Sequence, residues 1–334
     1  MALLDLLDTV SHALANLAAA RPALIWPLVL AVALACLVKS ADVFTAAAER
    51  VGVRAGLSPF VVGILIVSVG TSLPELVAAI FAVLRGASEM VVANVAGSNI
   101  ANLGLVLGLA AVMGGTVQIR RRLTHVDLPF LAGSTLLLAL MAWSGQVVAL
   151  EGVILLLGLA LYLHFGLHPP AHVESTPSPS SAVPGPLWRA LLGLLFGAGV
   201  LLVAADLTVV AVLEIADLFG IATETLAATV IALGTSLPEL VVTVVAARKG
   251  QAEMAVGNVV GSSVFNAFAV TGVAALVGPL AVPPSLIGLA LPLMVGITAL
   301  TIVMLHENSM SRWEGSLLLL VYAYFLLAIT GLVA

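Results

Sequence analysis

One heptapeptide occurs twice in this chain, as Gly70-Thr71-Ser72-Leu73-Pro74-Glu75-Leu76 and as Gly234-Thr235-Ser236-Leu237-Pro238-Glu239-Leu240. Each copy places an acid and two hydroxyl side chains inside a long apolar run. The offset of 164 residues continues beyond the heptapeptide, and residues 70–102 and 234–266 are identical at 18 of 33 positions. A polar motif that recurs in both halves predicts a duplicated membrane protein whose site lies between the copies.

The composition is that of an integral membrane protein. The chain is 62% hydrophobic and 9% charged, with a mean hydropathy of +1.22, whereas a soluble domain is about 45–50% apolar and about 25% charged. The charges of such a chain mostly mark loops and sites, so the net charge of -5 indicates no nucleic-acid partner and leaves protein partners open. The single cysteine, Cys36, excludes an internal disulfide, and its apolar setting favours a packed side chain over a reactive thiol.

Ten apolar runs follow one another along the chain, and a helix needs about 20 residues to cross a bilayer core of about 30 Å. The runs are Leu24–Phe44, Leu57–Leu84, Val91–Met113, Leu128–Trp143, Val147–Phe165, Leu187–Leu213, Ile221–Ala247, Ala255–Val277, Leu286–Leu305 and Leu317–Val333. All four tryptophans fall at run ends, where we expect their rings at headgroup level. The sequence thus predicts an all-α integral membrane protein of ten transmembrane helices.

The division of the chain follows from these runs. Residues 24–166 and 187–334 form two five-helix repeats, joined by a Pro/Ser-rich linker at 167–186 that is too polar to pack a core. Residues 1–23 are either a short helix lying at the interface or a frayed leader. Because five is odd, the second repeat crosses the membrane in the opposite direction from the first, so the repeats have inverted topology.

Basic residues indicate the orientation in a plasma or inner membrane. Two lie in the loops of one side, Arg21 and Arg85. Nine lie in the loops of the other side: Arg50, Arg54, Arg120, Arg121, Arg122, Arg189, Arg248, Lys249 and Arg312. The positive-inside rule makes the richer side cytoplasmic. Both termini then face outward, and the linker faces the cytoplasm.

Pro74 and Pro238 predict irregular helices at the two motifs. Pro74 lacks an N–H and its ring clashes with the carbonyl of Gly70, so we expect the helix to break or kink there and to free carbonyl oxygens. Irregular backbone at membrane depth is tolerated only where it is buried in protein or lines a wet cavity.

The polar residues around each proline form an all-oxygen set. Thr71 and Glu75 are four residues apart and share a helix face, as do Ser98 and Asn102 on the next helix. The second half repeats this set with Thr235, Glu239, Ser262 and Asn266. Carboxylate, amide and hydroxyl oxygens are the ligands of hard cations such as calcium and sodium. An intramembrane carboxylate is costly unless it is used or paired, so two at equivalent positions predict an ion site.

Other polar residues have more ordinary interpretations. Asp42 and Asp206 also differ by 164 and serve either gating or interfacial structure. Glu89 and Glu253 precede apolar runs, where an acid suits a helix N-terminus. The remaining intramembrane candidates have no repeat partner and are expected at the interface: His125, Asp127, His164 and His306. His168 and His172 are separated by two prolines, which argues against a metal site in the linker.

The two heptapeptides, each followed by Gly-Ser-x-x-x-Asn at 97–102 and 261–266, resemble the two α-repeats of the calcium:cation antiporter superfamily, with the sodium/calcium exchanger branch most similar. The resemblance covers essentially both halves. It implies ten transmembrane helices, a calcium site between the second, third, seventh and eighth of them, and alternating access in which sodium and calcium compete for ligands. It also implies a transporter without a cofactor rather than an enzyme.

The resemblance assigns roles by position. Glu75 and Glu239 would bridge calcium, assisted by Thr71 and Thr235. The sodium sites would be completed by Ser72, Ser98, Asn102, Ser236, Ser262, Asn266 and the backbone carbonyls of Ser68 and Ala232. Some family members carry Asp at the position of Asn266, and the potassium-dependent branch resembles that form. Asn266 therefore argues against potassium cotransport.

Three functions fit the motifs to different degrees. The leading hypothesis is a sodium-driven calcium exporter. The alternative is a proton/calcium antiporter, but the proton-coupled branch has an Asn-Ala motif in place of Thr-Ser-Leu-Pro and a His after the Glu, where this chain has Leu76 and Leu240. A calcium channel is weaker still, because inverted repeats around a midplane site suit a carrier.

Overall fold

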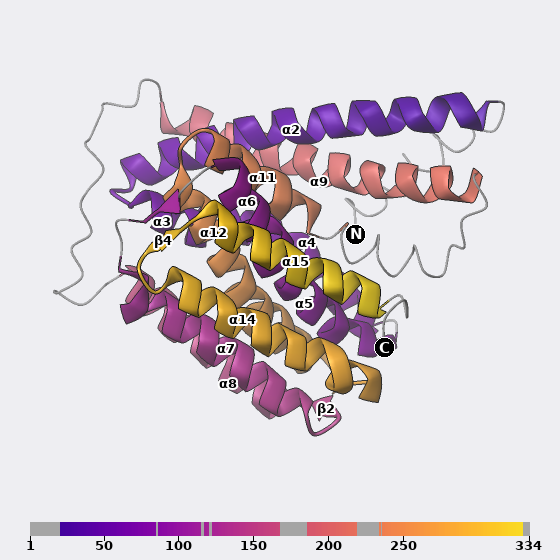
Figure 1. Cartoon of the computed structure of the whole chain (residues 1–334), viewed down its shortest axis with the longest axis vertical. Coiled ribbons are helices and arrows are strands. Elements are labelled where there is room, and N and C mark those ends of the chain that lie inside the picture. The colour runs from indigo at the N-terminus through magenta and orange to yellow at the C-terminus, as the bar shows by residue number, and fades with distance from the viewer. Residues whose placement is uncertain are drawn as a thin grey trace.

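The structure, a computed structural model, describes residues 21–84, 86–114, 117–119, 122–167, 186–218, 234 and 236–329. It is built almost entirely of helices (Figure 1). The helical segments of the first half are α2 (Pro22–Arg54), α3 (Pro59–Val62), η1 (Gly63–Val67), α4 (Ser68–Leu84), α5 (Glu89–Ala101), η2 (Asn102–Val106), α6 (Leu107–Gly114), η3 (Leu123–His125), α7 (Asp127–Ala142) and α8 (Ala149–Leu167). Those of the second half are α9 (Leu187–Leu218), α11 (Leu237–Arg248), α12 (Ala252–Phe265), η4 (Asn266–Val270), α13 (Thr271–Val277), η5 (Leu286–Ala290), α14 (Leu291–Leu305) and α15 (Arg312–Ile329).

Eight helical spans of the described residues are long and apolar enough to cross a membrane. They are Pro22–Arg54, Pro59–Leu84, Glu89–Gly114, Ala149–Leu167, Leu187–Ile215, Ala252–Val277, Leu286–Leu305 and Arg312–Ile329. The fourth predicted run corresponds to the shorter helix α7, and the seventh is described only in α11. These spans establish an all-α, multi-pass membrane protein. The predicted N-terminal segment and linker fall almost entirely outside the described residues.

Helix α2 is longer than its apolar run, which the sequence predicts to end at Phe44. It continues to Arg54 because the residues that follow Phe44 include alanines, a glutamate and arginines, which are good helix formers. It stops where Gly56 takes a φ of 69°, a left-handed conformation that favours glycine after a helix C-terminus.

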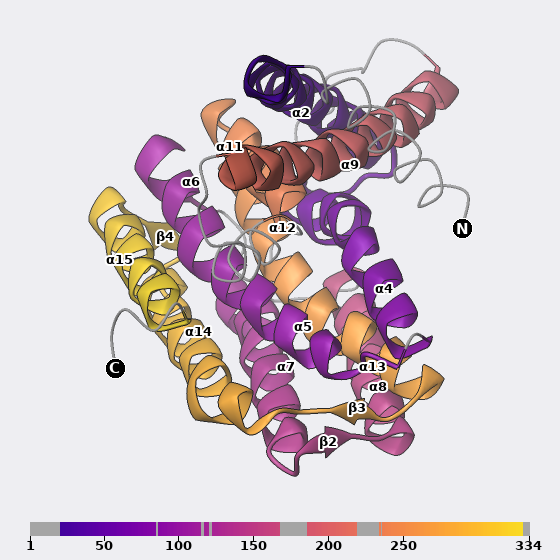
Figure 2. The ribbon, with the colours of Figure 1, turned by 90° about the vertical axis from the view of Figure 1, so that its right-hand side faces the viewer.

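The two halves pack crosswise (Figure 2). Helix α6 of the first half packs against α15 of the second, and α13 of the second packs against α8 of the first. Glycines permit both contacts: a Cβ on Gly108 would lie 2.9 Å from the carbonyl oxygen of Gly315, and one on Gly272 would lie 3.1 Å from that of Gly152. Both pairs therefore join helices of opposite halves.

Four two-residue strands, absent from the sequence prediction, extend this crosswise arrangement. Strand β1 (Val117–Gln118) pairs antiparallel with β4 (Ser309–Met310), and β2 (Gln146–Val147) pairs antiparallel with β3 (Leu280–Ala281). In each pair one strand comes from each half. Two residues are too few to show the alternation of apolar and polar residues by which strands are recognised in a sequence.

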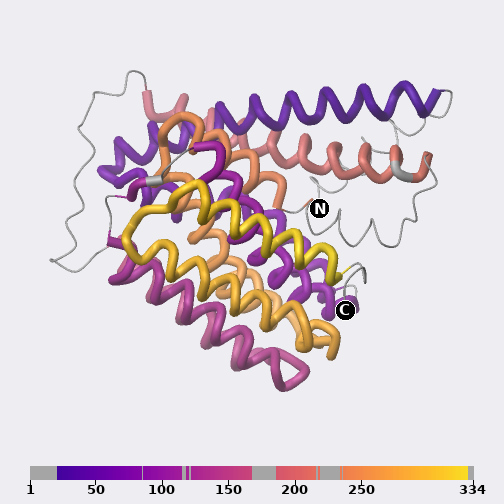
Figure 3. The backbone as a smooth tube through the Cα atoms, viewed as in Figure 1, coloured from indigo at the N-terminus to yellow at the C-terminus, as the bar shows by residue number. Residues whose placement is uncertain are grey.

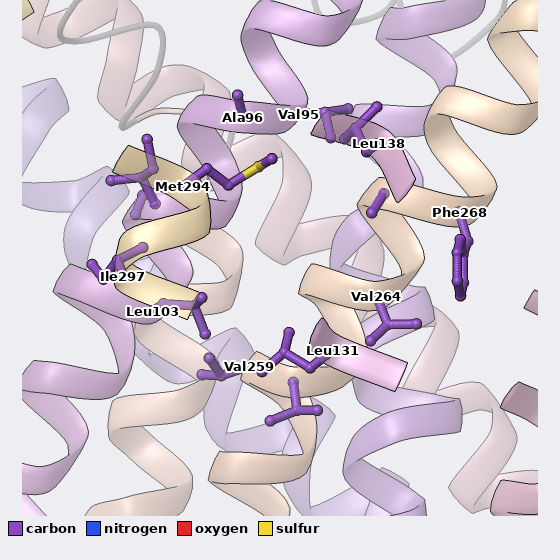
Figure 4. Packing of buried hydrophobic residues seen from close by; sticks show 14 of the residues in the cluster. Val95, Ala96, Leu103, Leu131, Leu138, Val259, Val264, Phe268, Met294 and Ile297 are labelled. Atoms are coloured by element: carbon purple, nitrogen blue, oxygen red, sulfur yellow. The ribbon is translucent and has the colours of Figure 1, made fainter. Parts of the chain in front are cut away.

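The hydrophobic core is centred on the helices that follow the two motifs. In the spans Glu89–Gly114 and Ala252–Val277, 83% of the most apolar window is buried, against 22% for Pro22–Arg54. Figure 4 shows core side chains from both halves gathered there, including Val95, Leu103, Val259 and Val264. The central position of these helices makes them the scaffold for the polar residues described below.

One expectation about α2 is wrong, because Cys36 is exposed on the surface of the helix rather than packed. Trp26 is only 2% exposed and packs with Ala211 of α9, whereas Trp143, Trp188 and Trp313 are exposed. Because residues 22–38 of α2 are apolar on all sides, their sequence pattern does not indicate which face is covered.

Candidate functional site

The first motif lies within an unbroken helix. The sequence predicts a break or a kink at Pro74, and the break is absent, because α4 runs from Ser68 to Leu84 with Pro74 inside it. The irregular backbone lies earlier, in the π-helical turn η1. The Thr71 hydroxyl donates to the carbonyl of Val67 at 3.1 Å, and such side-chain bonds and π turns are how transmembrane helices accommodate a proline.

The second motif begins a described helix instead. Helix α11 starts at Leu237 with Pro238 in its first turn, where the missing N–H has no intrahelical partner to lose. Ser236 is the N-cap residue. Ala232 and Thr235, both predicted site residues, lie outside the described residues.

The fold brings the two motif acids together. Glu75 and Glu239 are each 1% exposed, and the helices that carry them, α4 and α11, contact one another. A hydrogen bond joins the motifs, because the Ser72 hydroxyl donates to Oε1 of Glu239 at 3.1 Å. An acid of one half thus lies beside a hydroxyl of the other, which the duplication suggests but does not require.

Asn102 and Asn266 open equivalent π-helical turns. Each is the first residue of its turn, η2 or η4, and its carbonyl accepts from the N–H five residues later. Such turns are rare and occur frequently at functional sites. The turn η4 packs against α4, which carries Glu75, and η2 packs against α11, which carries Glu239. Each asparagine therefore lies at a helix interface with the acid of the opposite half.

Several buried oxygens of this region have no hydrogen-bond partner among the described residues. They are both carboxylate oxygens of Glu75, Oε2 of Glu239, the side-chain oxygens of Asn102 and Asn266, and the hydroxyls of Ser236 and Ser262. A buried polar group without a partner costs about 1–3 kcal/mol, and more when it is charged. A cation that binds these oxygens would offset that cost.

A hydrogen-bonded chain supports Thr71 from the second half. Nδ2 of Asn258 donates to Oγ1 of Thr243 at 2.8 Å, and the Thr71 hydroxyl lies 3.4 Å from Oδ1 of Asn258. All three side chains are buried. Asn258 is not among the site residues predicted from the sequence, although its match to Asn94 in the repeat is a signal that could have identified it.

The other predicted site residues lie close by in the fold. Ser98 is fully buried in α5. The Ser68 carbonyl accepts from the Thr71 hydroxyl at 3.3 Å, so it is already bonded. The Ser68 side chain fits against Gly261, since a Cβ there would lie 2.7 Å from Oγ of Ser68. Gly261 thus leaves room for Ser68 beside Ser262.

The other acids considered as candidates lie outside the cluster around Glu75 and Glu239. Asp42 forms an ion pair with Lys249 at 2.8 Å, which ties α2 to the end of α11. Glu89 and Glu253 lie in the first turns of α5 and α12, as expected. Asp127, which is expected at the interface, is the first residue of α7 and is fully buried. Within the described ranges no three His, Cys, Asp or Glu side chains gather as metal ligands, so the candidate site consists of two acids among amides and hydroxyls.

Comparison with known proteins identifies the family. The profile described as sodium/calcium exchanger protein matches residues 25–167 and 189–331. The chain belongs to the sodium/calcium exchanger family. The family profile matches it twice, and the two matches coincide with the halves that carry the duplicated motif.

Individual exchangers and related membrane proteins extend this similarity over most of the chain. The sodium/calcium exchanger MaX1 of Methanosarcina acetivorans is 29% identical over an alignment of 342 positions, gaps included. The alignment covers 90% of this chain and 97% of that protein. The inner membrane protein YrbG of Escherichia coli is 32% identical over 263 residues, covering 76% and 81%. The sodium-calcium exchanger NCX_Mj, in a crystal soaked with zero Na+ and Ca2+, has a TM-score of 0.78 at 28% identity and covers 92% of this chain and 99% of its own.

Proposed function

We propose that this member of the family exchanges sodium for calcium across the membrane by alternating access. The observation that carries the proposal is the pair of buried carboxylates, Glu75 and Glu239, one from each half. Together they supply two negative charges, which balance one calcium ion. Amide and hydroxyl oxygens around them are ligands that both calcium and sodium accept.

Coupling follows from shared ligands. If both ions use the same two carboxylates, the site holds either one calcium or several sodium ions. Occupation by one ion then excludes the other, so each crossing of calcium requires sodium to cross in the opposite direction. By position, Glu75, Glu239, Thr71 and Thr235 bind calcium, while sodium also uses the remaining predicted set: Ser72, Ser98, Asn102, Ser236, Ser262, Asn266, Ser68 and Ala232.

The proposal includes a topology. Residues 24–166 and 187–334 form two five-helix repeats of inverted topology, joined by the cytoplasmic linker 167–186, with both termini outside the cell. Features that recur with nearly the same offset support it: the π turns η2 and η4, the crosswise glycine pairs, and the strand pairs β1–β4 and β2–β3. Paired repeats around a midplane site are the architecture of carriers that rock between two states.

Calcium uptake into sealed vesicles tests the function. Vesicles loaded with sodium and diluted into sodium-free medium should take up calcium, and collapse of the sodium gradient should abolish the uptake. A pH gradient without sodium should drive no uptake. Uptake driven by the pH gradient alone would establish proton coupling instead, and uptake with neither gradient would establish a channel.

Asn266→Asp is expected to change the ion dependence of transport. The substitution adds a third carboxylate at an interface with α4, and like charges in one buried site bind either a proton or another cation. We expect exchange to become dependent on pH or to be stimulated by potassium, whereas Asn266→Ala should mainly weaken the sodium dependence. Calcium flux is measured across pH and in sodium and potassium media.

Gln118→Glu is the matched control, because it adds an acid at an exposed position of β1. It should leave both dependences unchanged. An Asn266→Asp variant that behaves like the parent in every medium would exclude Asn266 from the ion site.

A further inference from the structure

Helices α2 and α9 lie side by side and antiparallel along one edge of the molecule (Figure 3). A Cβ on Gly193 would lie 3.4 Å from Cβ of Ala47, and one on Gly197 would lie 3.0 Å from the backbone of Phe44. At the other end of the pair, Trp26 of α2 packs with α9. The two backbones therefore approach closely, and cavities flank the line of contact.

A polar cavity lies at the arginine-bearing end of the pair. It has a volume of about 270 Å³ and is lined by Asp42, Val43, Ala46, Ala47, Arg50, Arg189 and Gly193. Asp42 is already neutralised by Lys249, at 2.8 Å. Neither Arg50 nor Arg189 forms an ion pair with another described residue. The cavity thus presents two guanidinium groups that have no ion-pair partner among the described residues, and such groups suit a phosphate.

An aromatic ring places this cavity at headgroup level. The guanidinium carbon of Arg189 lies 5.3 Å from the centre of the Trp188 ring, which is 56% exposed. Tryptophan and arginine together at the end of an apolar helix are typical of the membrane–water interface. Basic cavities between transmembrane helices at this level bind anionic lipid headgroups.

An apolar cavity lies farther along the same two helices. It has a volume of about 330 Å³ and is lined by Leu28, Val29, Val32, Ala33, Cys36, Val200, Val203, Ala204 and Leu207. Leu28 and Val32 are 61% and 55% exposed, so the cavity opens to the surroundings of the protein. In a membrane those surroundings are acyl chains.

The two cavities lie on one face of the helix pair. On α2 the positions 32, 36, 43, 46 and 50 recur at helical spacing, and on α9 the positions 189, 193, 200 and 203 do the same. Cys36 and Arg50 are separated by about 21 Å along the helix. That is about half the thickness of a bilayer with its headgroups, which is the length of one phospholipid.

We propose that an anionic phospholipid binds along this face, with its phosphate between Arg50 and Arg189 and the end of an acyl chain in the apolar cavity around Cys36. The charge of the polar cavity selects an anionic headgroup, and the apolar cavity selects a lipid over a free phosphate. The bound lipid links the first helix of each half.

Cys36 reports on occupancy, because it is the only cysteine of the chain and lines the apolar cavity. The purified full chain in detergent is treated with N-ethylmaleimide in the presence of phosphatidylglycerol, phosphatidylcholine or inorganic phosphate. We expect phosphatidylglycerol to slow modification several-fold at concentrations where the other two have little effect. Equal protection of Cys36 by phosphatidylcholine would overturn the preference for an anionic headgroup. Equal protection of Cys36 by inorganic phosphate would overturn the proposal that the ligand is a lipid.

The double variant Arg50→Gln/Arg189→Gln tests the headgroup contact. It should require about tenfold more phosphatidylglycerol for the same protection of Cys36, since each arginine near a membrane surface contributes to the attraction of anionic lipid. Arg312→Gln is the matched control, because Arg312 is exposed at the start of α15. If the double variant aggregates, each single variant is tested in the same way. Protection equal to the parent in a folded double variant would overturn the proposal.

Discussion

Calcium transport is expected to fall to background in Glu75→Gln and in Glu239→Gln. Glutamine keeps the volume of the side chain but removes one of the two charges that offset the dehydration of calcium. Both acids are 1% exposed, so bulk water does not reach the site to solvate the calcium ion in place of the lost carboxylate. The measurement is sodium-driven calcium uptake into vesicles that contain equal amounts of each protein.

Glu89→Gln is the matched control. Glu89 lies in the first turn of α5, is exposed, and interacts with the helix dipole, which is worth about 0.3–1 kcal/mol. The same substitution there should leave most of the uptake intact. Near-normal calcium flux in Glu75→Gln or Glu239→Gln would contradict the two-glutamate site.

A binding measurement separates a lost site from a lost conformational change. Calcium at about 100 times its dissociation constant should stabilise the parent by about 2.7 kcal/mol, because it binds only the folded state. The Glu75→Gln and Glu239→Gln variants should lose most of this stabilisation while remaining folded in its absence. A variant that is stabilised by calcium as the parent is, yet does not transport it, would place the defect in the crossing step.

Gly257→Ala is expected to destabilise the contact between the two halves severely. A Cβ on Gly257 would lie 2.4 Å from the carbonyl oxygen of Phe60 and 3.3 Å from Cα of Gly63. The opposing atoms are backbone, so no side-chain rotation relieves the overlap, and α12 must move away from α3 and η1. Overpacking of this kind costs about 1–3 kcal/mol, and sometimes more. Thermal unfolding in detergent and gel filtration measure the effect.

The same substitution in open space should have the opposite sign. Gly133 lies inside α7, and a Cβ there would meet nothing within 4 Å. Gly133→Ala removes a poor helix former and should stabilise the helix by up to about 1 kcal/mol. If Gly257→Ala unfolds at the temperature of Gly133→Ala, the close approach of the two halves at Gly257 is absent in the membrane protein.

The sequence alone identified the membrane class, the duplication and the two motif acids. Those conclusions rest on signals that are local or exactly repeated: apolar runs of helical length, and an acid followed by the same residues at an offset of 164. Burying an acid inside an apolar run costs free energy wherever the run packs. Glu75 and Glu239 are therefore predicted as site residues before any fold is known. The predicted runs agree well in position with the helical spans Glu89–Gly114, Ala149–Leu167 and Leu286–Leu305.

Local signals were less reliable about backbone irregularity. Pro74 predicts a break or a kink, yet α4 continues through it without a break. The irregular turn lies earlier, in η1, and the Thr71 hydroxyl donates to a backbone carbonyl. The π turns at Asn102 and Asn266 have no proline to mark them. They pack against helices of the other half, and no short window of sequence contains such contacts.

Only the tertiary structure decided which groups meet. Ser72 bonds to Glu239 and Asn258 approaches Thr71 across more than 160 residues of chain, so neither contact follows from helical spacing. Likewise, Cys36 and Trp26 lie in the part of α2, residues 22–38, that is apolar on every side. Hydrophobicity there does not distinguish the lipid-facing surface from the covered one. The sequence determines which residues are costly to bury, because that cost belongs to each side chain alone. The fold determines which of them share a site, because that depends on how two distant halves pack.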